Sequence, residues 1–177
     1  MSTTGHTSAT NRILVSGSDK VVEETDRIEG NTNCYPGRSV VKGTNDDEVN
    51  VAGAAGMTLG WLGYETCNKK DMPATRATIY AQDAHAPVIH GPGIILMAQV
   101  ATTLSITKGE SLVQGANGEL TKAVRMVTAA GTVAVTGDAD DAHITGSLPD
   151  GGPIIAKAME TINTSGGAQL IKVMSLI

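Results

Sequence analysis

The sequence predicts a mostly β fold, either a small β-barrel or a β-sandwich built from two related hairpin units, and three observations support it. The chain has 21 glycines and no phenylalanine among its 177 residues. Small and β-branched side chains fill thin, sheet-built cores, and glycine at this density separates short strands with turns. Short alternating apolar segments recur along the chain, and one hairpin pattern occurs twice.

The clearest predicted element is a β-hairpin in residues 108–122, KGESLVQGANGELTK. At its centre, Asn117 and Gly118 both accept a positive φ, so this turn matches the right-handed twist of paired strands. Gly109 and Gly115 flank the incoming strand. We expect all four residues to be structural, because the hairpin contains no reactive side chain.

A first copy of the hairpin is predicted in residues 36–49, PGRSVVKGTNDDEV. Its turn residues Gly37, Gly43 and Asn45 each lie 72 positions before a matching residue of the second copy. The repeat extends further, since LGYET at 62–66 resembles KAMET at 157–161 with an offset of 95. Duplicated β units predict one domain over residues 13–177, with repeat-like halves at about 13–80 and 94–177.

The remaining short strands follow from alternating or β-branched segments between turn residues. Residues 94–107 are compatible with either a buried helix start or one bent strand, although their threonine-rich second half favours a strand. We expect Pro87 to interrupt the strand that contains residues 88–89. The other expected strands cover residues 12–15, 49–51, 57–65, 78–80, 131–135, 154–159 and 169–177.

Residues 1–12 are small and polar, so they predict an extended N-terminal arm that cannot bury enough apolar surface to fold alone. A contact with a partner and a contact with the chain's own domain are both open for this arm. The partner-binding candidates in it are Ser2, Thr3, Thr4, His6 and Arg12. Downstream, the acidic residues between 23 and 29 indicate either a solvated face or loop, or a contact with a basic partner.

No motif in the chain indicates catalysis, a cofactor or a metal, so we expect a protein that is not an enzyme. His85 and His90 have the wrong spacing for one face of a helix or strand. Cys34 and Cys67 lack the spacing of a zinc site and make only a weak case for a disulfide. The net charge of −5 argues against nucleic acid, and no segment predicts a membrane span. The scarcity of bulky side chains argues against a small-molecule pocket. Trp61, the one tryptophan, is expected to be a core or interface anchor.

The second half of the chain resembles the capsid decoration, or cement, proteins of tailed phages and archaeal tailed viruses. The resemblance rests on ITKGESLVQGANGELTKA followed, after an insertion, by PIIAKAMETINTSGGAQLIKVMSLI. It covers residues 104–177 well and the first half as a weaker copy. The matching positions are Gly109, Leu112, Val113, Gly118, Ala123, Ala156, Lys157, Ala158, Ala168 and Val173.

This resemblance implies a structural protein of the virion, made in the host cytoplasm, that binds the outer surface of the assembled major capsid protein lattice. It also implies contacts with neighbouring copies of the same chain, in a trimer for many members. A tail or baseplate β module is the alternative, and a binding module or β-fold enzyme ranks below both. Copy number per particle would separate decoration from a baseplate role.

Overall fold

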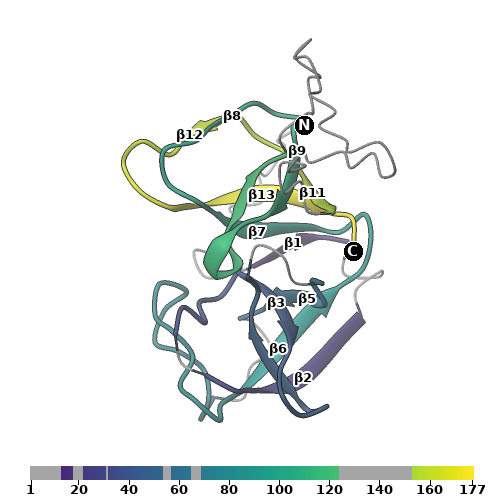
Figure 1. Cartoon of the computed structure of the whole chain (residues 1–177), viewed down its shortest axis with the longest axis vertical. Coiled ribbons are helices and arrows are strands. Elements are labelled where there is room, and N and C mark those ends of the chain that lie inside the picture. The colour runs from purple at the N-terminus through teal and green to yellow at the C-terminus, as the bar shows by residue number, and fades with distance from the viewer. Residues whose placement is uncertain (1–12, 18–21, 31, 54–56, 65–68, 124–152) are drawn as a thin grey trace, which may run out of the picture.

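The chain folds into two small closed β-barrels, which lie one above the other in a computed structural model (Figure 1). The structure describes residues 13–17, 22–30, 32–53, 57–64, 69–123 and 153–177. No described residue lies in an α-helix. The mostly β prediction is therefore confirmed, with barrels in place of a sandwich.

Each barrel has five strands that hydrogen-bond in the same cyclic order. The first barrel consists of β2 (Val22–Ile28), β4 (Glu48–Val51), β3 (Ser39–Lys42), β5 (Gly60–Leu62) and β6 (His85–His90), and pairing of β6 with β2 closes it. The second consists of β7 (Ile95–Val100), β10 (Leu120–Lys122), β9 (Ser111–Gln114), β11 (Ile154–Ala158) and β13 (Gln169–Ser175), and pairing of β13 with β7 closes it.

Within the described ranges, three short strands lie outside these two rings. β1 (Leu14–Ser16) pairs antiparallel with the start of β7, so it lies against the second barrel although the strands that follow it form the first. β8 (Ser105–Ile106) and β12 (Ile162–Asn163) form a separate two-stranded sheet. A single 3-10 turn, Ala116–Gly118, joins β9 to β10.

The two barrels repeat one topology, and their hydrogen bonds align strand by strand. β9 begins 72 positions after β3, as the hairpin repeat predicts. In the first barrel, Leu62 N–H donates to Arg38 O; in the second, Ala158 N–H donates to Glu110 O. The offset between β5 and β11 is therefore 96, and the predicted offset of 95 was wrong by one residue. A one-residue slip moves every side chain to the opposite face, so sequence similarity alone could not set this register.

Two other strand predictions were wrong because tertiary contacts override local propensity. Residues 78–80 form no strand: Tyr80 fills the first barrel, and its hydroxyl donates to Gly63 O at 2.8 Å. Pro87 does not interrupt β6, which runs through it. The carbonyl of Pro87 accepts from the N–H of Gly63, which lies just beyond the end of β5. The nitrogen of Pro87, which has no hydrogen to donate, therefore faces a point where the pairing between β5 and β6 has already ended. The first barrel thus extends to β6, beyond the expected end of the first half at residue 80.

Trp61 connects the two cores because β5 is covered on both faces. Successive side chains of a strand point to opposite sides. Leu62 accordingly packs among the buried residues of the first barrel, while Trp61 packs with those of the second. Trp61 is 0% exposed, and its Nε1–H donates to Ser175 Oγ on β13 at 3.2 Å. The tryptophan therefore anchors one barrel on the other.

A comparison of Gly37 with Gly109 shows how the surroundings of equivalent positions differ between the two barrels. They are equivalent by the offset of 72, and both have a positive φ, of 83° and 91°. A Cβ at Gly37 would lie 2.7 Å from both Met97 O and a methyl of Leu170 on the second barrel, whereas a Cβ at Gly109 would meet nothing within 4 Å.

We expect Gly37→Ala to destabilise the protein more than Gly109→Ala. Both variants place alanine in the left-handed region at a cost of about 1–2 kcal/mol. Gly37→Ala adds overpacking between the barrels, of about 1–3 kcal/mol. Urea unfolding followed by the fluorescence of Trp61 would measure the difference. Equal losses of stability would show that the barrels yield at Gly37 without cost.

Candidate functional site

The residues of the predicted N-terminal arm, from Ser2 to Arg12, lie outside the described residues. The predicted turn residues lie inside them and belong to the two hairpins. Gly43 N–H donates to Glu48 O, and Gly115 N–H donates to Glu119 O, so the two glycines close corresponding turns, of which the first is one residue longer. Asn45 stabilises the first turn through its side chain, whose Nδ2–H donates to Glu48 Oε2 at 2.8 Å.

The turn of the second hairpin has a further role, because its tip docks on the first barrel. Asn117 and Gly118 both have positive φ, of 56° and 70°, as the Asn-Gly pattern predicts. Gly118 N–H donates to Ala52 O at 2.7 Å. A Cβ on Gly118 would lie 2.6 Å from Ser39 O. Glycine is required here for the close approach of two barrels as well as for the turn.

Arg38 makes two of the polar contacts that hold this tip in place. Its Nη1 donates to Asn117 O at 2.9 Å, and its Nη2 donates to Glu119 Oε1 at 2.7 Å. The guanidinium also lies over the ring of Tyr35, 4.8 Å from the ring centroid. Arg38 is only 7% exposed. Burial lowers the pKa of its guanidinium, and the neighbouring Glu119 carboxylate opposes that shift.

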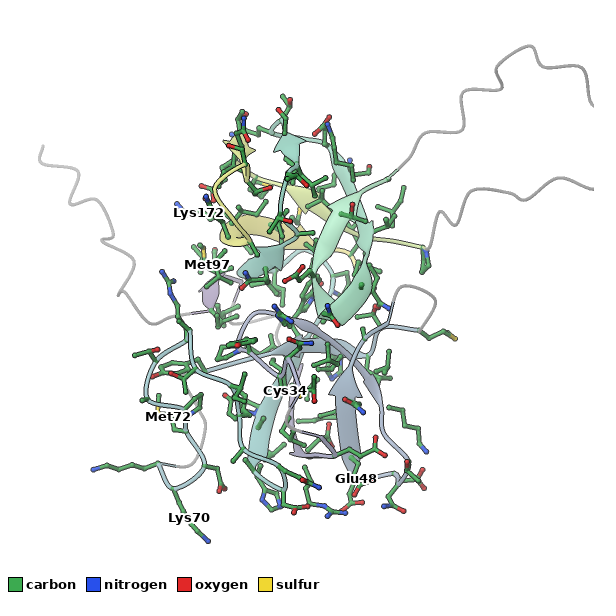
Figure 2. All side chains as sticks on the ribbon, turned by 60° about the vertical axis from the view of Figure 1, so that its left-hand side comes forward. Cys34, Glu48, Lys70, Met72, Met97 and Lys172 are labelled. Carbon is green, nitrogen blue, oxygen red and sulfur yellow. The ribbon has the colours of Figure 1, made fainter. Side chains whose placement is uncertain are left out.

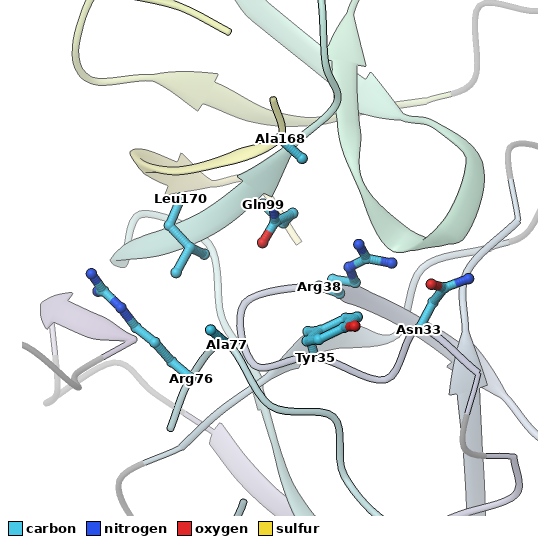
Figure 3. A pocket seen from close by; sticks show the side chains of 8 residues that line it. All are labelled: Asn33, Tyr35, Arg38, Arg76, Ala77, Gln99, Ala168 and Leu170. Carbon is cyan, nitrogen blue, oxygen red and sulfur yellow. The ribbon is translucent and has the colours of Figure 1, made fainter. Parts of the chain in front are cut away.

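An open trough of about 390 Å³ runs along the junction beside Arg38. We call it the interbarrel trough. It combines the loop before β3, the turn before β6, and strands β7 and β13, so no single barrel forms it (Figure 3). Figure 3 shows Arg76 on one side, Arg38 and Tyr35 on the other, and Leu170 and Gln99 above. Its lining residues are Asn33, Tyr35, Arg38, Arg76, Ala77, Gln99, Ala168 and Leu170.

The trough contains cationic groups whose bonding capacity is incompletely used by the described residues. Arg76 has no ion-pair or hydrogen-bond partner among them. Arg38 uses both terminal nitrogens, but its buried Nε–H finds no acceptor in the described part of the chain. A buried donor without an acceptor costs about 1–3 kcal/mol.

Other chemistry-bearing residues are kept apart. His85 and His90 lie at opposite ends of β6, and each lies 3.9–4.0 Å from a different carboxylate. No group of three His, Cys, Asp or Glu residues within the described ranges could hold a metal ion. The described residues also include no helix with the length and apolar character needed to cross a membrane.

Of the acidic residues between 23 and 29, Glu23, Glu24 and Asp26 lie on β2, which ends at Ile28, so these three do not form a loop. Glu24 is exposed. Burial raises the pKa of the Asp26 carboxyl, and the neighbouring charges of Glu24 and Asp47 raise it further. A solvated strand face and a contact with a basic partner both stay open for this segment.

No protein-family model matches the chain, and no curated protein matches it in sequence. The interbarrel trough was missed by sequence reasoning because its residues come from four separated segments. One signal was present in the repeat, where Arg38 occupies the position equivalent to Glu110. A reversal of charge within a repeated motif indicates that the two copies face different surroundings.

We expect Arg38→Met to destabilise the protein by about 3–5 kcal/mol, because it leaves Glu119 and the carbonyl of Asn117 without their donor. Lys122→Met is the matched control. Lys122 pairs with Glu110 at 2.9 Å, but both side chains are more than a third exposed, so this loss should cost about 0–1 kcal/mol. Urea unfolding of both variants measures the difference. Comparable losses would mean that Arg38 does not hold the barrels together.

Cys34 should be unreactive in the native protein. It is buried in the first barrel (Figure 2), its Sγ–H donates to Gly30 O, and burial raises the pKa of its thiol to about 11. At pH 8 the thiolate fraction is then about a hundredfold below that of an ordinary cysteine. Iodoacetamide should modify Cys34 only after the protein is unfolded, and peptide mass mapping would detect the modification. Rapid native labelling at this site would contradict its burial.

Proposed function

We propose that this protein is a capsid decoration, or cement, protein that binds the outer surface of an assembled major capsid protein lattice and stabilises the viral head. The observation that carries the proposal is where the residues of the resemblance lie. They form the framework of a single barrel: Gly109 precedes β9, Gly118 ends the docking turn, Ala156 and Ala158 are buried on β11, and Val173 is buried on β13. The resemblance therefore concerns one coherent folding unit.

The duplication of that unit also supports a structural role. Two barrels of one topology, joined by Trp61 and Arg38, give a body with surfaces on both units for contacts with neighbouring subunits. A cement protein acts by repeating modest contacts over a lattice, so that weak individual interactions together resist expansion. A single rigid body transmits force between two contact points better than two barrels on a free linker.

The predicted N-terminal arm has a defined part in this proposal. An arm that orders on a neighbouring subunit adds contacts at an entropic cost, which the rest of the interface offsets. In the proposed complex, residues 1–12 contact the capsid or a neighbouring copy, and the two barrels supply the remaining interface. The capsid lattice and other copies of the chain are accordingly the proposed partners.

We expect purified protein to bind saturably to expanded shells of its virus from which it has been removed, in a co-sedimentation assay. Deletion of residues 1–12 should leave the fluorescence of buried Trp61 unchanged and weaken shell binding about tenfold, equivalent to about 1.4 kcal/mol. Full occupancy by the deletion variant would disprove the role of the arm. Absence of binding by the full chain would disprove the capsid role, and a count of a few copies per native particle would favour the tail or baseplate alternative.

A further inference from the structure

The charge of the interbarrel trough selects one class of ligand. Arg38 and Arg76 both line the trough. The carboxylate of Glu119 pairs with Arg38 and neutralises part of their combined positive charge. One net positive charge is left, which matches a single carboxylate. A phosphoryl group, with a charge of about −1.5 to −2 at neutral pH, would exceed it. The chain as a whole has a charge of −5, so an acidic ligand gains nothing from the overall field.

The shape of the trough favours a polypeptide over a free small molecule. Small-molecule sites typically enclose about 70–90% of the ligand surface, whereas this trough is open along the junction. Figure 3 shows its two arginines on opposite sides, with the side chains of Leu170 and Ala77 between them. A ligand that uses both ends must therefore be extended and must offer apolar contacts in its middle.

Each end of the trough suits a different group of such a ligand. Arg76 is half-buried and lacks a partner among the described residues, so it is available to a carboxylate. Arg38 already has one carboxylate partner, and its remaining donor is the single Nε–H without an acceptor in the described ranges. That Nε–H is closed to solvent, so a ligand lies against the Arg38 side chain without bonding to this atom. Gln99 adds an amide between the two ends.

We propose that the interbarrel trough is a binding site for an extended segment of a partner polypeptide, whose acidic side chain pairs with Arg76 and whose main chain crosses Gln99 towards the Arg38 end. The site would couple partner binding to the junction between the barrels, because its walls come from both. This inference does not rest on the capsid role, since it concerns peptide chemistry and its test contains no viral shell.

The test uses the full chain and a set of dye-labelled decapeptides with blocked termini that contain alanine and leucine. Each peptide carries one glutamate at a different position and is compared with a twin that has glutamine there. Fluorescence anisotropy should detect a subset of glutamate peptides that bind about fivefold more tightly than their twins, the effect expected of one partly exposed ion pair. Arg76→Gln should abolish this preference, and Arg76→Lys should retain part of it.

Lys108→Gln is the matched control, because it removes one exposed positive charge from the β8–β9 turn and does not line the trough. It should leave the glutamate preference unchanged. The proposal is overturned if no peptide binds, if glutamate and glutamine twins bind equally, or if Arg76→Gln and Lys108→Gln have the same effect. If free N-acetylglutamate competes at the same concentration as the peptide, the polypeptide assignment is overturned and the trough is a site for free carboxylates. Unchanged urea unfolding of Arg76→Gln would exclude misfolding as the cause of lost binding.

Discussion

The contact between Arg38 and the Asn117-Gly118 turn is the constraint on which the two-barrel arrangement depends. Each barrel is closed, so neither offers a strand edge for joining the other at this place. The junction uses side chains, turn backbone and a bond from strand β7, in which Gln99 N–H donates to Gly37 O. Arg38 supplies the donors, the turn supplies the acceptors, and Gly118 permits the close approach that brings them within bonding distance. A buried charge is tolerated here because Glu119 pairs with it.

Duplication gave the chain two copies of one barrel, and the copies differ where they meet. Gly37 and Gly109 keep the same backbone conformation, yet only Gly37 is pressed against the other barrel. Arg38 and Glu110 are equivalent, yet Arg38 is buried in the junction while Glu110 forms a more exposed pair with Lys122. The repeated backbone thus sets the fold of each unit, and a few substituted side chains set how the units combine.

The interbarrel trough is a consequence of this docking. Its walls belong to segments that no single barrel brings together, and Arg38 and Arg76 line a space bounded by both barrels. Stability at the junction and binding in the trough therefore share Arg38. A partner that contacted both walls of the trough would favour the docked arrangement of the barrels, so its binding would stabilise the junction.

The sequence by itself determined the features that depend on local conformation. The Asn-Gly turn with its positive φ values and the offset of 72 between β3 and β9 follow from residue types and spacing. Tertiary structure decided what depends on distant neighbours: the non-strand conformation of Tyr80, the continuity of β6 through Pro87, and the register of β11 against β9. The trough belongs to this second group, because a binding site made by docking two closed units has no periodic pattern along the chain. Local preferences are encoded in neighbouring residues, whereas docking is encoded in the complementarity of surfaces that only the folded units possess.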